Sequence, residues 1–256
     1  MTLADRLKAG ETLFTAWSGI PDALTVEVLA AQDFDVVTLD MQHGGHNEDS
    51  VLRSIVPVKR ANKPAIVRVP VGRFDMASRA LDFGAEAVIA PMINSLDDAR
   101  RFAASMKYPP LGERSWGPTY AGPRGGLTTQ QDWLRTANAR TYAIAMIETR
   151  AAVDALDGIL ATPGIDGIFL GPSDFSIAWT HGQTIDTTLE DMMEAIADIA
   201  KRAEAAGKFC GIYIIDPAVS GRMVAMGYRL LALGSEHKLI SLGAETLLKS
   251  VRDAIG

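Results

Sequence analysis

Eight short apolar runs recur along the chain, and each is followed by a segment in which apolar residues recur with helical spacing. The runs are apolar at nearly every position, which is typical of strands buried on both faces, as in a parallel sheet. The predicted strands span residues 12–18, 34–40, 64–70, 87–92, 142–148, 167–172, 209–215 and 228–234.

Eight strand–helix units in 256 residues predict an α/β fold with a single domain over residues 1–256, a (β/α)8 TIM barrel. A doubly wound parallel sheet is the alternative, but that fold usually has fewer strands and a glycine-rich first turn. The first turn here, WSGIPDA, has no G-x-G-x-x-G pattern. Expected helix ends fit the repeated units: the N-caps are Asn47 and Ser95, and the glycines just past C-termini are Gly84, Gly207 and Gly227.

One connection is unusually long. Residues 109–141 separate the fourth helix from the fifth strand and are rich in glycine, proline and aromatic residues. Connections of this length within a compact domain are usually lids or binding segments. An exposed insertion or a contact between subunits is the alternative, so we expect an active-site or interface loop.

Composition narrows the class of partner. The chain is 48% hydrophobic and 22% charged, and its net charge of −6 argues against nucleic acid or an anionic membrane as the main partner. The N-terminal segment lacks the apolar stretch of a signal peptide, and no apolar run reaches the roughly 18 residues that cross a bilayer. The single cysteine, Cys210, excludes an internal disulfide and a cysteine metal cluster. We therefore expect a cytoplasmic protein.

The chemistry of such a barrel lies at the carboxyl ends of its strands. In this chain those ends carry carboxylates, an imidazole and a guanidinium from separate strands, and this convergence is the main functional signal of the sequence. The residues at the predicted strand ends are Trp17, Asp40, Gln42, His43, Arg68, Met92, Asn94, Glu148, Gly171, Pro172, Ser173, Asp174, Asp216, Gly234, Ser235 and Glu236.

Glu148 and Asp174 end neighbouring predicted strands, so we expect their carboxylates to lie side by side. Two carboxylates at close range repel each other unless a shared proton, a basic side chain or a cation neutralises them. A hard cation such as Mg²⁺ binds one or two carboxylates and completes its shell with water and substrate oxygens. The structural alternative is a helix cap at Asp174 and a first-turn acid at Glu148.

Arg68 and His43 supply the other ionisable groups. Arg68 lies inside an apolar run, where a cation is nearly always paired, so it is either half of a structural ion pair or a cation aimed at an oxyanion. His43 is a natural proton acceptor near neutral pH. The remaining histidines, His46, His181 and His237, are expected on the surface or in loops. No lysine ends a predicted strand, so carbonyl chemistry would be assisted by metal and not by a Schiff base.

Taken together, these segments resemble the HpcH/HpaI aldolase family, the class II pyruvate aldolases. The likeness covers nearly the whole chain and rests on DFDVVTLDMQH, AIVRVP, ALDFGAEAVIAPM, KYPPLGERSWG, IAMIETRAAV, GIDGIFLGPSDFS and LALGSE. It implies reversible aldol addition and cleavage of 4-hydroxy-2-oxoacids, with pyruvate or hydroxypyruvate as donor and an aldehyde as acceptor. It also implies a homohexamer, a trimer of dimers, in which the last helix is exchanged between subunits.

The resemblance implies a role for each matching residue at the site. Glu148 and Asp174 would hold a divalent cation (Mg²⁺, Mn²⁺ or Co²⁺), which the 2-oxoacid would chelate. The expected substrate contacts are Arg68, Ser173, Gly171, Pro172, Trp17 and Gln42.

The same resemblance implies the proton-transfer groups. His43 would be the general base, and Asp82 of an adjacent subunit would raise its basicity. Arg68 would stabilise the enolate, and Asp40 would orient His43 and Arg68.

Two positions depart from the family pattern. D-x-E-H reads DMQH here, so Gln42 replaces an acid near the base, and Met146 stands where the family often has glutamine. Both lie on the substrate side, so the preference for donor and acceptor is left open. A CoA-thioester lyase of the malyl/citramalyl type and a non-catalytic metabolite-binding barrel are the alternatives.

Overall fold

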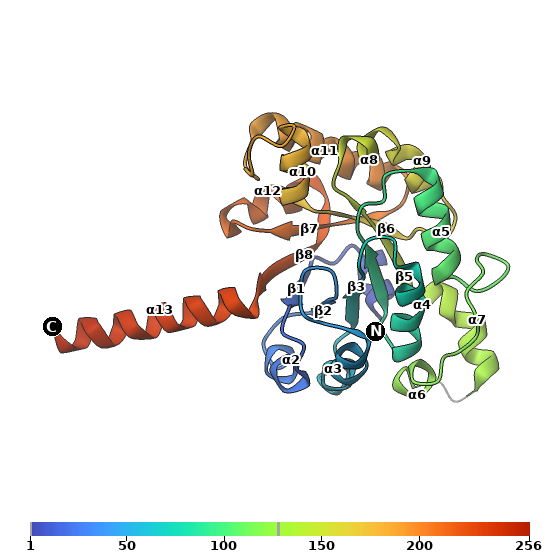
Figure 1. Cartoon of the computed structure of the whole chain (residues 1–256), viewed down its shortest axis with the longest axis horizontal. Coiled ribbons are helices and arrows are strands. Elements are labelled where there is room, and N and C mark those ends of the chain that lie inside the picture. Colours follow the sequence, from blue (N-terminus) through green and yellow to red (C-terminus); the bar gives the residue numbers. More distant parts are fainter. Residues whose placement is uncertain (1, 127–128) are drawn as a thin grey trace.

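The computed structural model describes residues 2–126 and 129–256, and its eight parallel strands close into a barrel in chain order (Figure 1). β8 returns to pair with β1. The predicted (β/α)8 barrel is confirmed, the doubly wound alternative is wrong, and the predicted strand ends agree to within two residues. The strands are β1 (Leu13–Ser18), β2 (Val36–Asp40), β3 (Ala65–Arg68), β4 (Ala87–Ala90), β5 (Tyr142–Ile147), β6 (Gly167–Leu170), β7 (Phe209–Ile214) and β8 (Tyr228–Ser235).

Helices cover the outside of the barrel. The expected N-caps Asn47 and Ser95 each accept a hydrogen bond from the first helical turn, and Gly84 and Gly227 adopt the left-handed backbone expected at a C-cap. The helices are α1 (Leu3–Lys8), α2 (Ala23–Ala30), α3 (Glu48–Arg60), α4 (Phe74–Phe83), α5 (Leu96–Met106), α6 (Ala121–Arg124), α7 (Gln130–Arg140), α8 (Arg150–Asp154), α9 (Leu156–Ala161), α10 (Pro172–Trp179), α11 (Glu190–Ala205), a 3-10 turn η1 (Pro217–Val219), α12 (Ser220–Met226) and α13 (Glu236–Ile255).

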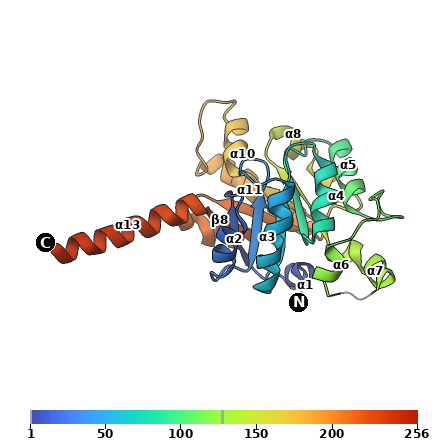
Figure 2. The same cartoon turned by 60° about the horizontal axis from the view of Figure 1, so that its bottom comes forward.

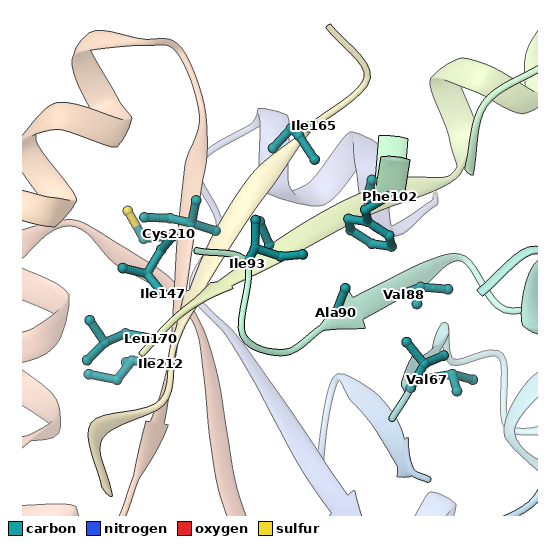
Figure 3. Close-up of a cluster of buried hydrophobic side chains, with 14 of the residues drawn as sticks. Val67, Val88, Ala90, Ile93, Phe102, Ile147, Ile165, Leu170, Cys210 and Ile212 are labelled. Carbon is teal, nitrogen blue, oxygen red and sulfur yellow. The ribbon is translucent and has the colours of Figure 1, made fainter. Parts of the chain in front are cut away.

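Each strand is buried on two sides. Ile66 and Ile144 face the interior of the barrel, whereas Val67 and Val88 face outward into a second core that includes Phe102 of α5 (Figure 3). Successive side chains of a strand point to opposite faces, so two cores require apolar residues at nearly every position. This explains why the sequence shows continuous apolar runs.

The two ends of the barrel differ. α1 closes the amino-terminal end, where Leu3, Ala4 and Leu7 join the interior core. The carboxyl ends of the strands lie at the opposite rim, which is where residues that act on a ligand are found in this fold.

The segment 109–141 is partly helical, since α6 and α7 lie within it, and its residues 127 and 128 lie outside the described part of the chain. Lys107 donates to the carbonyl of Thr141, which precedes β5, at 2.6 Å, and Arg124 donates to the carbonyl of Phe83, which precedes β4, at 2.5 Å. α7 contacts α1, and Figure 2 shows α6 and α7 on the side of the barrel where α1 lies. The described part of the segment therefore lies at the amino-terminal end of its own barrel and does not cover its own rim.

α13 extends away from the barrel as an isolated helix (Figures 1 and 2). After Glu236, every residue of this helix is exposed, including Ile240, Leu247, Val251 and Ile255. In the part of the chain that the structure describes, no helix combines the length and apolar character needed to cross a membrane. A large exposed apolar surface of this kind is typical of an interaction site.

Candidate active site

A cavity of about 170 Å³ opens at the carboxyl-terminal rim of the barrel. Residues from β1, β3, β5, β6 and β7 and from the segments that follow β2, β5 and β6 converge on it, as expected for an active site of this fold. Its lining consists of Trp17, His43, Arg68, Met146, Glu148, Phe169, Gly171, Pro172, Ser173, Asp174 and Tyr213.

Glu148 and Asp174 both line this cavity, as predicted. Glu148 is buried just past β5 and accepts the amide N–H of Met92 at 2.9 Å. Met92 has a left-handed backbone, with φ of 56°, which is strained for a residue with a side chain. Gly171 allows the carboxylate to lie against β6, because a Cβ there would come within 2.5 Å of Glu148 Oε1.

The charge state of Glu148 is set by its surroundings. Burial raises its pKa to about 7, and the charge of Asp174 adds to this shift, while the Met92 hydrogen bond and the charge of Arg68 oppose it. The carboxyl is therefore poised to lose its proton when a positive charge arrives.

Asp40 and Arg68 form a buried pair at the ends of β2 and β3. Arg68 donates from Nε to Asp40 Oδ1 at 2.8 Å and from Nη2 to Oδ2 at 2.6 Å, and its guanidinium lies 4.9 Å from the centre of the Trp17 ring. Burial would raise the pKa of Asp40, but the hydrogen bonds and charge of Arg68 hold it below its usual range. Nη1 of Arg68 has no hydrogen-bond partner within the described residues, so it is the free donor of the pair.

Asp40 also holds the segment that carries His43. Its carboxylate accepts the backbone N–H groups of Gln42 at 3.0 Å, His43 at 3.4 Å and Gly44 at 3.1 Å. The imidazole of His43 is exposed at the cavity, and within the described residues no side chain holds it by a hydrogen bond. Gln42, predicted to contact the substrate, does not line the cavity.

The start of α10 faces the cavity. Gly171 is its N-cap, Pro172 is in its first turn, and Ser173 and Asp174 follow. The first amide N–H groups of a helix have no partner within the helix and carry partial positive charge. This end of α10 can therefore receive an anionic group such as a carboxylate.

Asp82 lies away from this cavity, at the end of α4. Its Oδ1 accepts Nη2 of Arg114 at 2.5 Å, and Arg114 is buried within the long segment. Burial raises the pKa of Asp82, and the charge of Arg114 opposes that shift. Oδ2 of Asp82 accepts no hydrogen bond within the described residues, and Gly117 leaves space beside it.

The structure places His46 in the loop between β2 and α3, one of the two places expected for it, but not at the surface. Its exposed fraction is 4%, and its ring contacts Ser18 and Ser50. Its position depends on contacts with residues far away in the sequence, so local pattern could not reveal it. His181 and His237 are exposed, as predicted.

Sequence reasoning missed two lining residues, Phe169 and Tyr213. Tyr213 packs edge-on against Trp17, with ring centres 5.4 Å apart, and burial raises the pKa of its hydroxyl. Both residues sit inside apolar strands and face the barrel interior, so the alternation of strand faces was the available signal.

The donor set fits a hard divalent cation that keeps open positions. Two carboxylates face one cavity, and the described residues contain no group of three or more histidine, cysteine or acidic side chains that could enclose a metal. Mg²⁺ commonly binds through one or two carboxylates and leaves its other positions to water and substrate. A zinc site built from histidine and cysteine does not match these residues.

A rim built from a buried carboxylate, a fixed arginine and an exposed imidazole defines the chain as a (β/α)8-barrel enzyme. The model of the HpcH/HpaI aldolase/citrate lyase family matches residues 14–242. The chain therefore belongs to this family, and it is a carbon–carbon lyase of the class II aldolase type.

Individual relatives agree with this assignment. A hydroxypyruvate/pyruvate aldolase of Roseovarius nubinhibens is 33% identical over 97% of this chain and 96% of its own. A 4-hydroxy-2-oxo-heptane-1,7-dioate aldolase of Salmonella dublin is 32% identical over 95% of this chain and 91% of its own. The crystal structure of a family member from Burkholderia cenocepacia J2315 matches with a TM-score of 0.87 at 29% identity, over 98% of each chain.

Proposed function

We propose that the chain is a metal-dependent aldolase that adds pyruvate or hydroxypyruvate reversibly to an aldehyde to form a 4-hydroxy-2-oxoacid. The observation that carries the proposal is the joint placement of Glu148, Asp174, Arg68 and His43 around one small cavity. The similarity to the Roseovarius hydroxypyruvate/pyruvate aldolase supports pyruvate and hydroxypyruvate as donors. Gln42 and Met146 depart from the family pattern on the substrate side, so the proposal names no particular aldehyde.

Glu148 and Asp174 would hold Mg²⁺, Mn²⁺ or Co²⁺, and such a cation would supply a positive charge that polarises the keto group of the 2-oxoacid. The amide groups of Ser173 and Asp174, at the start of α10, would receive the substrate carboxylate. Gly171 and Pro172 would shape the adjoining wall.

His43 would take a proton from the carbon beside the keto group. Arg68, held by Asp40 and Trp17, would present its free Nη1 to the oxygen on which negative charge develops. A pre-oriented cation in a partly buried site stabilises such charge without reorganising. In the cleavage direction the same groups act in reverse order.

The rival CoA-thioester lyase requires cationic groups for the phosphates of CoA. Arg68 is the sole arginine or lysine in the cavity lining of the described chain, and Asp40 already pairs with it. We therefore favour a small donor and acceptor.

We also propose that the enzyme is a homo-oligomer, by family analogy a hexamer formed as a trimer of dimers. α13 presents Ile240, Leu247, Val251 and Ile255 with exposed fractions of 55% to 80%. Fully burying one such side chain contributes about 1.5–3 kcal/mol. A groove of about 380 Å³, lined by Val28, Leu29 and Phe34 beside the start of α13, is a matching apolar surface for a second copy.

The test is an aldol assay of pyruvate and hydroxypyruvate, each with a panel of aldehydes, with and without a chelator. We expect turnover with Mg²⁺, Mn²⁺ or Co²⁺, loss of turnover on chelation, and loss of both metal and activity in Glu148→Ala and Asp174→Ala. Full activity in metal-free protein would exclude the proposed mechanism. Absence of turnover with every pair would favour a binding protein.

A further inference from the structure

A second cluster of polar side chains lies outside the cavity and is completely enclosed. It joins Ser18 at the end of β1, His46 after β2 and Glu236 at the start of α13, all with exposed fractions of 4% or less. Ser18 Oγ lies 2.9 Å from His46 Nε2 and 2.5 Å from Glu236 Oε1. Groups buried this deeply are retained only when their hydrogen bonds are made.

The contacts determine which group donates and which accepts in the hydrogen bonds between Ser18, His46 and Glu236. Both oxygens of Glu236 accept, one from Ser18 and the other from the N–H of Gly19 at 2.8 Å. Ser18 donates to Glu236 and so accepts from Nε2–H of His46. Burial lowers the pKa of His46, against the charges of Glu236 and Asp40, and Nδ1 of its ring lies 3.1 Å from Ser50 Oγ.

This cluster is not a nucleophilic triad. A triad places histidine between the serine and the acid, so that the imidazole can take the serine proton. Here serine lies between histidine and the acid, its hydroxyl donates to a carboxylate, and it is 0% exposed. Ser18 cannot reach a substrate in this arrangement.

The cluster does contact the segment that carries His43. The N–H of Gly45 donates to the carbonyl of Gly19 at 2.8 Å, and Glu236 fixes the N–H of the same Gly19. A Cβ at Gly44 would lie 2.9 Å from the Cα of Gly19, and one at Gly45 would lie 2.9 Å from Pro21. Residues 41–46 are thus held by Asp40 on one side and by the Gly19 turn on the other.

We propose that Ser18, His46 and Glu236 are positioning residues for His43. They lock the turn at Gly19 and the end of the 41–46 segment to the start of α13, and so fix the distance of the imidazole from the reacting carbon. This inference rests on the proposed function, in which His43 is the general base.

The test uses Ser18→Ala and Glu236→Gln in the full chain, loaded with metal. Ser54→Ala is the matched control, because Ser54 is equally buried and its hydroxyl has no hydrogen-bond partner within the described residues. Displacing a reacting group by about 1 Å can lower a rate about 100-fold. We expect kcat and the exchange of the C3 protons of pyruvate to fall about 10- to 100-fold, with KM for the 2-oxoacid and metal affinity unchanged. Ser54→Ala should match the parent.

A double-mutant cycle separates positioning from general damage. If Ser18 acts through His43, Ser18→Ala adds no further loss to the residual rate of His43→Ala. Independent, additive losses would overturn the inference while leaving the aldolase proposal intact.

Amide hydrogen exchange of residues 41–46 gives a readout that does not depend on turnover. We expect faster exchange there in Ser18→Ala and Glu236→Gln, and parental exchange in Ser54→Ala. Unchanged exchange in both variants would overturn the inference whether or not the parent is an aldolase. A parent that exchanges no C3 protons of pyruvate would instead overturn the proposed function.

Discussion

At the scale of single residues, the carboxylate of Glu148 depends on the absence of a side chain at its neighbour. Gly171 leaves the space in which Glu148 Oε1 lies, because an added Cβ would come within 2.5 Å of that oxygen. Gly171 directly follows β6, which is hydrogen-bonded to β5 and β7, so we expect the carboxylate and not the backbone to move.

We expect Gly171→Ala to weaken metal binding and lower kcat at least tenfold, on the order of 1.4 kcal/mol. Gly221→Ala is the control, because a Cβ there meets nothing within 4 Å. Calorimetric titration with Mn²⁺ and an aldol assay measure the two effects. Equal affinities in the two variants would show that the close approach has no bearing on the site.

Burial also makes Glu148 sensitive to pH. Its pKa is raised to about 7, so at lower pH the carboxyl carries a proton that an arriving cation must displace. Apparent metal affinity should fall by about tenfold per pH unit below that value and level off above it. Titrations with Mn²⁺ at roughly pH 5.5 to 8.5, a range of about three pH units around that pKa, measure the apparent metal affinity. A flat affinity across the range would mean that Glu148 is ionised throughout or is not a ligand.

Most of the cavity could be predicted residue by residue, and the reason is geometric. Strand ends of a parallel barrel share one rim, so placing Arg68 and Glu148 at strand ends already placed them together. The burial of His46 could not be predicted in this way, because it depends on Ser18 and Glu236, which are 218 positions apart in the sequence. The pairing of Asp82 with Arg114 likewise depends on how a long connection packs.

At the scale of elements, α13 is the helix whose residues after Glu236 are all exposed in the described chain. Apolar residues at 240, 247, 251 and 255 follow helical spacing along one face, and Lys249 falls on the opposite face. The sequence showed the helix clearly, but amphipathic spacing alone cannot tell whether its apolar face packs on its own barrel or on another chain.

We expect Leu247→Glu to shift the protein toward smaller species, because it places a charge in the proposed contact. Lys249→Glu introduces the same residue on the opposite face and should leave the assembly unchanged. Sedimentation velocity of both variants measures the oligomeric state. Identical distributions for the two variants would remove α13 from the interface.

At the scale of the whole molecule, two groups at opposite ends of the barrel lack a partner within the described residues. The described residues offer the imidazole of His43 no orienting hydrogen bond, while Oδ2 of Asp82 is open at the other end of the barrel. We propose that a neighbouring subunit brings this acid to His43. An adjacent carboxylate favours the imidazolium and raises the pKa of the imidazole.

Asp82→Asn should therefore keep metal binding and assembly, lower the rate, and move the acidic limb of the pH–rate profile to lower pH. Mixing His43→Ala with Asp82→Asn subunits, after dissociation and reassembly, should restore some complete sites. An activity no higher than that of Asp82→Asn alone would show that the acid does not act across subunits.

The most direct measurement of the whole account is the exchange of the C3 protons of pyruvate with deuterated solvent, followed by proton NMR without any aldehyde. The parent protein with Mg²⁺ should exchange these protons, chelation should stop the exchange, and His43→Ala should slow it by about 10² to 10⁴ while keeping its fold. Exchange that persists unchanged in His43→Ala, or that is absent from the metal-loaded parent, would contradict the account.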